Sequence, residues 1–125
     1  MQIEIAKDLN VYKLAYELAM EIFEATNSFP SEVKYALTSQ IRRSSTSFCL
    51  NLREAWAKRR YELHFVSKLT DCDGEPNETD SSLDFAKDCG YIPCETHQRF
   101  VQKCTDVRRM LGGMIKKPQG FVITE

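Results

Sequence analysis

The chain has 125 residues, of which 42% are hydrophobic and 28% are charged, and its 17 basic and 18 acidic residues give a net charge of -1. This length and composition are typical of one soluble domain that buries its own core. They argue against a membrane-spanning protein, because no apolar run reaches about 18 residues. They also exclude a surface that attracts polyanions everywhere, although a local basic strip is compatible with them.

The cysteine pattern indicates a reducing compartment. The number of cysteines is odd, no CxxC motif is present, and the opening residues MQIEIAKD lack the apolar stretch of a secretory signal. We therefore expect a cytoplasmic protein whose thiols are reduced and serve as small core residues. The cysteines are Cys49, Cys72, Cys89, Cys94 and Cys104.

A first helix is predicted over about residues 9–27. Apolar residues recur there at steps of three and four, and Asp8 or Asn10 is placed to cap its start. A break follows, in which Ser28 can cap the next helix and Pro30 suits its first turn. Because this connection is short, we expect the first two helices to be antiparallel neighbours.

A second, longer helix is predicted over residues 30–60, with two faces of different character. At about 100° per residue, Arg42, Arg53 and Arg60 lie within about 20° of one another, nearly opposite the apolar stripe. We expect this rod to turn the stripe toward the core and its guanidinium groups outward. The inward positions are Val33, Leu37, Ile41, Ser44, Phe48, Asn51, Leu52 and Ala55.

The third helical segment, residues 61–90, follows a corner near residues 57–62 and contains a disruption. Gly74 and Pro76 interrupt its apolar spacing. A proline inside a helix costs about 3 kcal/mol and removes a backbone hydrogen bond. We therefore expect the third helix to be kinked or broken near Pro76, and Gly90 to cap its C-terminal end.

A fourth helix is predicted from Pro93 to about Lys117, where Pro118 would stop it, followed by a loose tail at 118–125. Four helical segments with short links, without the alternation typical of strands, predict an all-α, antiparallel up-down-up-down four-helix bundle. We expect a single domain over residues 1–125 whose core lies within about 9–117.

The segment LTSQIRRSSTSFCLNLREAWAKRRYELHFVSKLTDCDGE, with LDFAKDCGYI after it, carries a family resemblance. It resembles the bacterial four-helix-bundle family of proteins encoded in intervening sequences of 23S ribosomal RNA, which also includes the accessory protein of diversity-generating retroelements. The similarity extends over about residues 9–117. Its most specific parts are LTSQIRRSS at 37–45, Asn51 with Glu54, and DCGYI at 88–92.

This resemblance implies a bundle that assembles into a homo-oligomeric ring, commonly a pentamer. In the retroelement branch the ring binds a reverse transcriptase and nucleic acid through basic surface, so the implied partners are RNA or DNA and a reverse transcriptase. The chain departs from that branch in its slightly acidic net charge and in Pro76, which stands where relatives continue the helix.

The basic side of the second helix is the candidate nucleic-acid-binding site. Guanidinium groups bind phosphates through paired donors and release counterions on contact, and Trp56 and Tyr61 could stack on bases. The alternative is that the cations pair with carboxylates of the third segment or of another subunit. The candidate binding residues are Arg42, Arg43, Arg53, Lys58, Arg59 and Arg60, and the candidate carboxylates are Asp71, Asp73, Glu75, Glu78, Asp80 and Asp84.

Asn51 lies on the inward face of the second helix, where a buried amide needs hydrogen-bonding partners. We expect a structural polar core in which Glu78 or Thr79 meets Asn51 and fixes the helix register. A di-iron centre is not expected, because neither His64 nor His97 follows a glutamate by three positions.

No metal site, cofactor or catalytic residue is predicted. Cys94, His97 and Cys104 share one helical face, but zinc sites pair their cysteines closely on a turn, so these thiols are interpreted as part of a core seam. The chain has no Gly-rich phosphate loop, no HExxH motif, and no serine or cysteine with an evident base.

Cys49, Leu50 and Trp56 fall outside the apolar stripe of the second helix, which predicts a second buried surface and thus self-association. We therefore expect a non-enzymatic cytoplasmic bundle that forms a cyclic homo-oligomer. The predicted function is that of an RNA- or DNA-binding accessory protein. The alternative is a protein-interaction scaffold without nucleic-acid binding.

Overall fold

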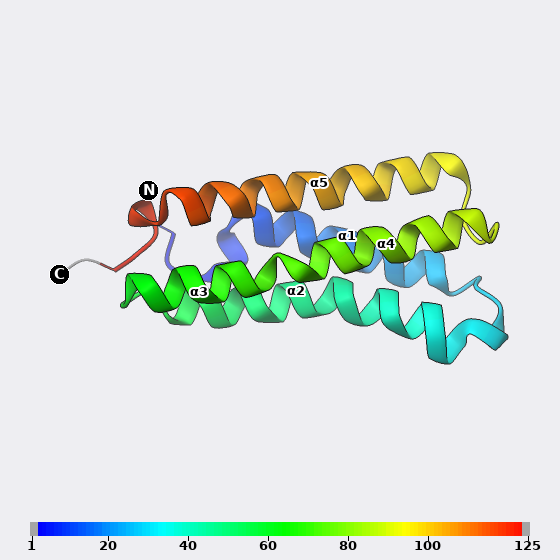
Figure 1. The fold of residues 1–125 in the computed structure, drawn as a ribbon, viewed down its shortest axis with the longest axis horizontal. Coiled ribbons are helices and arrows are strands. Elements are labelled where there is room, and N and C mark those ends of the chain that lie inside the picture. The colour runs from blue at the N-terminus through cyan, green and yellow to red at the C-terminus, as the bar shows by residue number, and fades with distance from the viewer. Residues whose placement is uncertain (1–2, 124–125) are drawn as a thin grey trace.

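The computed structural model describes residues 3–123 and confirms an all-α four-helix bundle (Figure 1). Successive rods run in opposite directions, and each packs against two neighbours, so that α1 contacts α2 and α5, and α4 contacts the same two helices. The rods are α1 (Asn10–Thr26), α2 (Ser39–Ala57), α3 (Glu62–Cys72) continued by α4 (Gly74–Asp88), and α5 (Cys94–Lys116).

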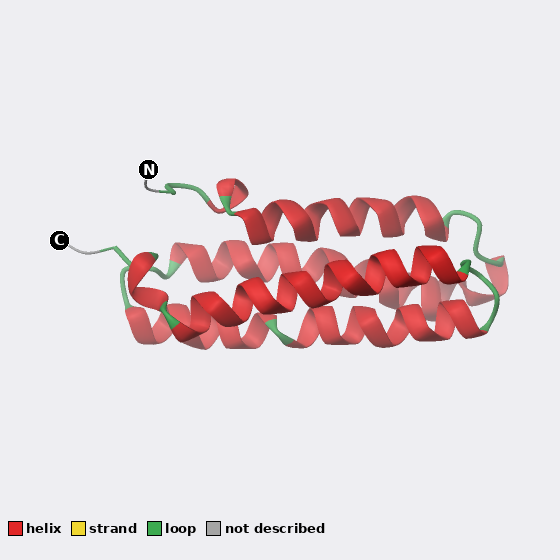
Figure 2. Cartoon of the chain, turned by 90° about the horizontal axis from the view of Figure 1, so that it is seen from above, coloured by secondary structure: helices red, strands yellow, loops and turns green. Residues whose placement is uncertain are grey.

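The two ends of the bundle carry different connections. Both chain termini and the α2–α3 corner lie at one end, and the α1–α2 link and the α4–α5 loop lie at the other (Figure 1). Figure 2 shows that most of the loops gather at these two ends. Within residues 3–123, none of the helices has the length and apolar character needed to cross a bilayer.

The third rod is broken rather than kinked. α3 ends at Cys72 and α4 begins at Gly74, so the break falls at Asp73, three residues before Pro76. Pro76 then lies in the first turn of α4, where its missing N–H has no intrahelical bond to lose. The two helices stay end to end and act as one rod of the bundle (Figure 1).

The second rod begins less regularly than predicted. Ser31–Val33 forms a 3₁₀ turn and Lys34–Thr38 a π-helical turn, and the α-helix starts only at Ser39. Val33 and Leu37 are therefore only partly buried, since they lie in the link beyond the end of α1. The remaining inward positions are confirmed as buried, except Asn51, which is half-buried: Ile41, Ser44, Phe48, Leu52 and Ala55.

The core consists of two apolar clusters, one toward each end of the bundle. Leu52, Phe65 and Leu111 belong to the cluster near the termini, and Ile22 and Phe100 belong to the other. Each of these five side chains is at most 2% exposed, which corresponds to about 1.5–3 kcal/mol of favourable transfer free energy per side chain. Burial of these stripes is what holds the four rods together.

The helix ends differ in how well they were predicted. Gly90 caps α4 as expected, with φ of 78° and its N–H donating to the Lys87 carbonyl at 2.9 Å. The predicted N-terminal caps do not form: Leu9 occupies the cap position of α1 without a side-chain bond, and Ser28 donates back to the Ala25 carbonyl at 3.0 Å.

The tail after α5 is packed in its described part, which corrects the prediction of a loose tail. Pro118 is buried in a 3₁₀ turn, and the Phe121 ring meets the Trp56 ring edge-on with centroids 6.3 Å apart. The Ile123 N–H donates to the Arg59 carbonyl at 3.1 Å. An aromatic side chain that reaches the end of the core thus anchors the tail, while residues 124–125 lie outside the described range.

Candidate nucleic-acid interface

Arg42 folds over the end of α1 instead of facing solvent. Its Nε donates to Thr26 Oγ1 at 2.7 Å, its Nη2 donates to Asn27 Oδ1 at 3.1 Å, and its guanidinium lies 4.4 Å from the centroid of the Phe23 ring. A cation in this place also offsets the negative end of the α1 dipole. Arg42 therefore joins α1 to α2.

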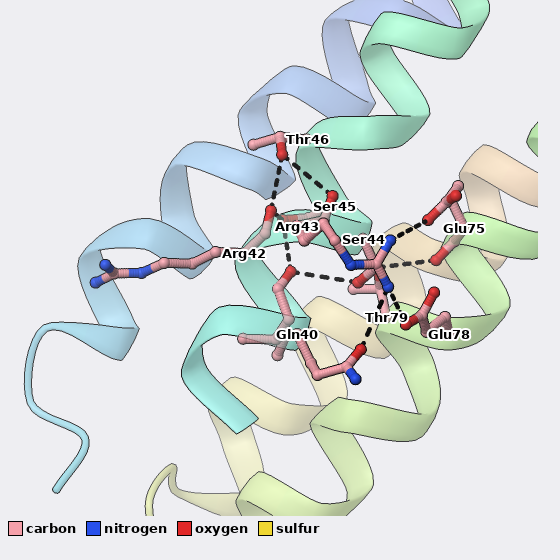
Figure 3. Close-up of polar contacts among 10 residues, drawn as sticks. Gln40, Arg42, Arg43, Ser44, Ser45, Thr46, Glu75, Glu78 and Thr79 are labelled. Atoms are coloured by element: carbon pink, nitrogen blue, oxygen red, sulfur yellow. Dashed lines mark hydrogen bonds and ion pairs between the residues drawn. The ribbon is translucent and has the colours of Figure 1, made fainter. Parts of the chain in front are cut away.

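Arg43 points the opposite way, toward α4 (Figure 3). Its guanidinium bonds to Glu78, its Nη1 lies 3.9 Å from Glu75 Oε2, and its Nη2 donates to Gln40 Oε1 at 3.3 Å. This is the pairing with carboxylates of the third segment that the sequence left open as the alternative. The pairs are partly exposed, so each contributes little to stability.

Arg59 also makes its contacts within the protein rather than facing solvent alone. Its guanidinium stacks 3.8 Å from the centroid of the Trp56 ring, its Nε donates to the Trp56 carbonyl at 3.0 Å, and its Nη2 lies 3.4 Å from the Glu4 carbonyl. Burial lowers the pKa of Arg59 from its usual value. Trp56 is itself 6% exposed and donates Nε1–H to the Glu4 carbonyl, so its ring is not open to a base.

We expect Arg42→Ala to lower the free energy of unfolding by about 1–2 kcal/mol, because hydrogen bonds from a charged donor and a cation–ring contact are lost. Arg53→Ala is the matched control and should change it by less than about 0.5 kcal/mol, since Arg53 is exposed and has no partner within residues 3–123. Urea unfolding followed by circular dichroism, at one protein concentration, measures both. Equal effects would contradict the structural role given to Arg42.

Arg53, Lys58 and Arg60 keep exposed side chains. Within residues 3–123, the side chains of Arg53 and Lys58 have no hydrogen-bonding or ion-pair partner, whereas Arg60 is engaged in a contact of its own. The fold also brings Lys7 and Lys13 to the same hollow as Arg53. Sequence reasoning missed these two lysines, because a periodic pattern within one helix says nothing about cations on the neighbouring segment.

Basic residues concentrate in the half of the bundle that holds both termini, named here the terminal half: residues 3–16, 49–73 and 105–123. It carries eleven of the 17 basic but only seven of the 18 acidic residues, and the other described residues carry six basic and ten acidic ones. The basic residues of the terminal half are Lys7, Lys13, Arg53, Lys58, Arg59, Arg60, Lys68, Arg108, Arg109, Lys116 and Lys117; its acidic residues are Glu4, Asp8, Glu54, Glu62, Asp71, Asp73 and Asp106.

The polar core contains Thr79, one of the two predicted partners, but pairs it with Ser44 instead of Asn51. Ser44 Oγ and Thr79 Oγ1 are buried and lie 2.7 Å apart. Glu78, by contrast, turns outward to Arg43, and Asn51 is half-buried without a hydrogen-bonding partner within residues 3–123. The prediction placed the network on the correct faces of the two helices, but Asn51 and the alternative partner Glu78 do not take part, because longer side chains can reach solvent from a partly buried backbone position.

The five cysteines divide into two environments. Burial raises the pKa of Cys49 to about 11 and the pKa values of Cys72 and Cys104 to about 12, so these thiols stay protonated at neutral pH and are poor nucleophiles. Cys89 and Cys94 are exposed on either side of the α4–α5 loop, which corrects their interpretation as core residues.

The helical face of Cys94, His97 and Cys104 does not form a cluster of ligands. Cys104 is fully buried and Cys94 is exposed, and His97 Nε2 lies 2.8 Å from Asp84 Oδ1. Within the part of the chain that the structure describes, no three His, Cys, Asp or Glu side chains converge as metal ligands would.

Cys49, Leu50 and Trp56 were predicted to lie outside the core stripe of the second helix, but only Leu50 is exposed. Cys49 and Trp56 are buried within the single chain, at 6% exposure each, whereas Leu50 is 63% exposed. On α1, Met20 and Phe23 are 48% and 49% exposed. These side chains leave some apolar surface on the first two helices uncovered.

Comparison with known proteins supports the bundle independently. A family model described as 23S rRNA-intervening sequence protein matches residues 7–113. A solved structure from Bacteroides thetaiotaomicron, a protein of unknown function from the S23 ribosomal protein family, is 27% identical with a TM-score of 0.75, covering 86% of this chain and 96% of that one. A comparison with curated proteins gives no match. The matched family does not indicate a catalytic activity.

Proposed function

The chain belongs to the 23S rRNA-intervening sequence protein family, and we propose that it is a non-enzymatic cytoplasmic protein that binds nucleic acid through the terminal half of its bundle. The observation that carries this proposal is the separation of charge along the bundle. The terminal half has an excess of basic residues although the whole chain has a net charge of -1.

The other half of the bundle, which carries more acidic than basic residues, is too far away to cancel this excess of positive charge. A helix of 23 residues such as α5 is about 35 Å long at 1.5 Å per residue, so the centres of the two halves lie well over a Debye length of about 8 Å apart at physiological salt. A polyanion at the terminal end therefore meets mainly the local positive charge. Arg53 and Lys58, which have no partner within residues 3–123, are free to neutralise phosphates.

Fluorescence anisotropy with a labelled RNA oligonucleotide, measured across a series of salt concentrations, tests the proposal. We expect the logarithm of the association constant to fall with the logarithm of salt with a slope of about -2 to -3.5, as three to five phosphates are neutralised. Lys58→Gln should reduce that slope. Lys34→Gln, an exposed lysine of the other half, is the control and should not. Absence of salt-sensitive binding at low ionic strength would overturn the proposal.

A protein scaffold that self-associates is the second candidate, favoured by the uncovered apolar side chains Met20, Phe23 and Leu50. Light scattering on the same samples distinguishes the two. An oligomer that shows no salt-sensitive RNA binding supports the scaffold, and a monomer that binds RNA supports the first candidate alone. An oligomer that also shows salt-sensitive RNA binding supports both candidates, as expected for a nucleic-acid-binding ring.

A further inference from the structure

A hollow between the first residues of α1, the turn before it and the end of α2 gathers cations of the terminal half. It measures about 470 Å³ and is lined by Lys7, Tyr12, Lys13, Tyr16 and Arg53. Pockets for small organic ligands typically measure about 300–1,000 Å³. Three cations and two aromatic rings thus line a space of the size that a single nucleotide unit requires.

The two tyrosines form a stacked aromatic pair in this hollow. Their ring centroids are 6.2 Å apart with an angle of 23° between the ring planes. Tyr12 is 8% exposed and anchored in the core, whereas Tyr16 is 53% exposed. The inner ring packs against the outer one, and the exposed part of the Tyr16 ring is a surface on which an incoming base can stack.

The three cations of the hollow are not neutralised by the protein. Within residues 3–123, the side chains of Lys7, Lys13 and Arg53 have no hydrogen-bonding or ion-pair partner. Two carboxylates close to them in sequence are directed elsewhere: Glu17 pairs with a lysine of α5, and Glu54 pairs with a lysine of α3 at 3.0 Å. Asp8, next to Lys7, is exposed and lines a different hollow. These three cationic side chains are therefore available to bind phosphates.

Resting on the nucleic-acid binding proposed above, we infer that this hollow binds single-stranded nucleic acid, with an unpaired base stacked on Tyr16 and the adjoining phosphates held by Arg53, Lys13 and Lys7. A duplex keeps its base faces inside the stack and offers only phosphates, grooves and sugar edges to such a surface. A strand with splayed bases offers both phosphates and aromatic faces. An exposed aromatic ring among cations therefore favours the single strand.

The test compares an oligouridine, an oligodeoxythymidine and an RNA duplex of equal length as labelled probes in anisotropy titrations. Tyr16→Leu should weaken binding of both single strands about tenfold while leaving the duplex nearly unchanged, because only base stacking is lost. Tyr35→Leu, which alters a tyrosine that is 89% exposed in the other half, is the matched control and should leave all affinities unchanged.

Arg53→Gln should weaken single-strand binding and reduce its salt slope by about 0.7, the contribution of one phosphate, whereas Tyr16→Leu should leave the slope unchanged. Circular dichroism confirms that each variant is folded. This inference alone is overturned if the wild type shows salt-sensitive binding and neither Tyr16→Leu nor Arg53→Gln weakens it. It is also overturned if the wild type binds the duplex and the single strands with equal affinity. Wild-type protein that binds none of the probes overturns the proposed function itself.

Discussion

Leu69→Ala is expected to lower the free energy of unfolding by about 2–5 kcal/mol, the cost of lost apolar contacts plus the cavity left behind. Leu69 is fully buried in α3, inside the cluster near the termini. Because a domain of this size is stable by only about 5–15 kcal/mol, this single change removes a large part of the total. Chemical denaturation at fixed protein concentration measures it.

Leu63 provides the matched control, since it is a leucine of the same helix that is 82% exposed. Leu63→Ala should change the free energy of unfolding by less than about 0.5 kcal/mol. Leu69→Met keeps most of the volume and should cost less than about 1.5 kcal/mol, which separates cavity formation from failure to fold. If the two alanine variants are equally destabilised, the inward face assigned to α3 is wrong.

Thr79→Val is the second large effect, with an expected loss of about 1–3 kcal/mol, the cost of leaving a buried polar group poorly satisfied. The substitution keeps the shape of the side chain but removes the hydroxyl that lies 2.7 Å from Ser44 Oγ. Ser44 is then left with a long contact of 3.3 Å to the Ile41 carbonyl. Thr79 also donates to the Glu75 carbonyl at 2.9 Å, so Ser44→Ala alone should cost less.

The double variant Ser44→Ala/Thr79→Val tests whether the two hydroxyls act as a pair. Removing both partners leaves no orphaned group at this point, so the double variant should lose less than the sum of the single variants, with a coupling of about 0.5–3 kcal/mol. Thermal and urea unfolding of all four proteins complete the cycle. Strictly additive losses would mean that the hydroxyls are satisfied independently.

The bundle could be predicted because the helical spacing of apolar residues is visible within short stretches of the sequence. The stripes of the first and fourth helices placed α1 and α5 within a few residues of their observed bounds, and Gly74 with Pro76 located the break in the third rod. The irregular start of α2 could not be predicted in this way. Its 3₁₀ and π-helical turns at Ser31–Val33 and Lys34–Thr38 depend on how the link crosses the end of α1.

The candidate site was only partly predictable. Arg42 and Arg43 are adjacent in sequence, yet one reaches Thr26 and Asn27 on the α1 side and the other reaches Glu78 on α4. A helical wheel gives the direction in which a side chain leaves the backbone. It does not give the direction in which a long, flexible guanidinium finally turns, which depends on the acceptors that neighbouring rods present.

The sequence by itself determined the number of rods, their order and the faces they bury, because short-range spacing of apolar residues decides which side of a helix avoids water. Only the tertiary structure decided which cations remain available to a ligand. Arg42, Arg43 and Arg59 bind other parts of the protein, whereas Arg53 lies with Lys7 and Lys13 at one hollow. The physical reason is that ion pairing, stacking and burial of an arginine require partners from distant segments, and those partners are brought near only when the rods pack.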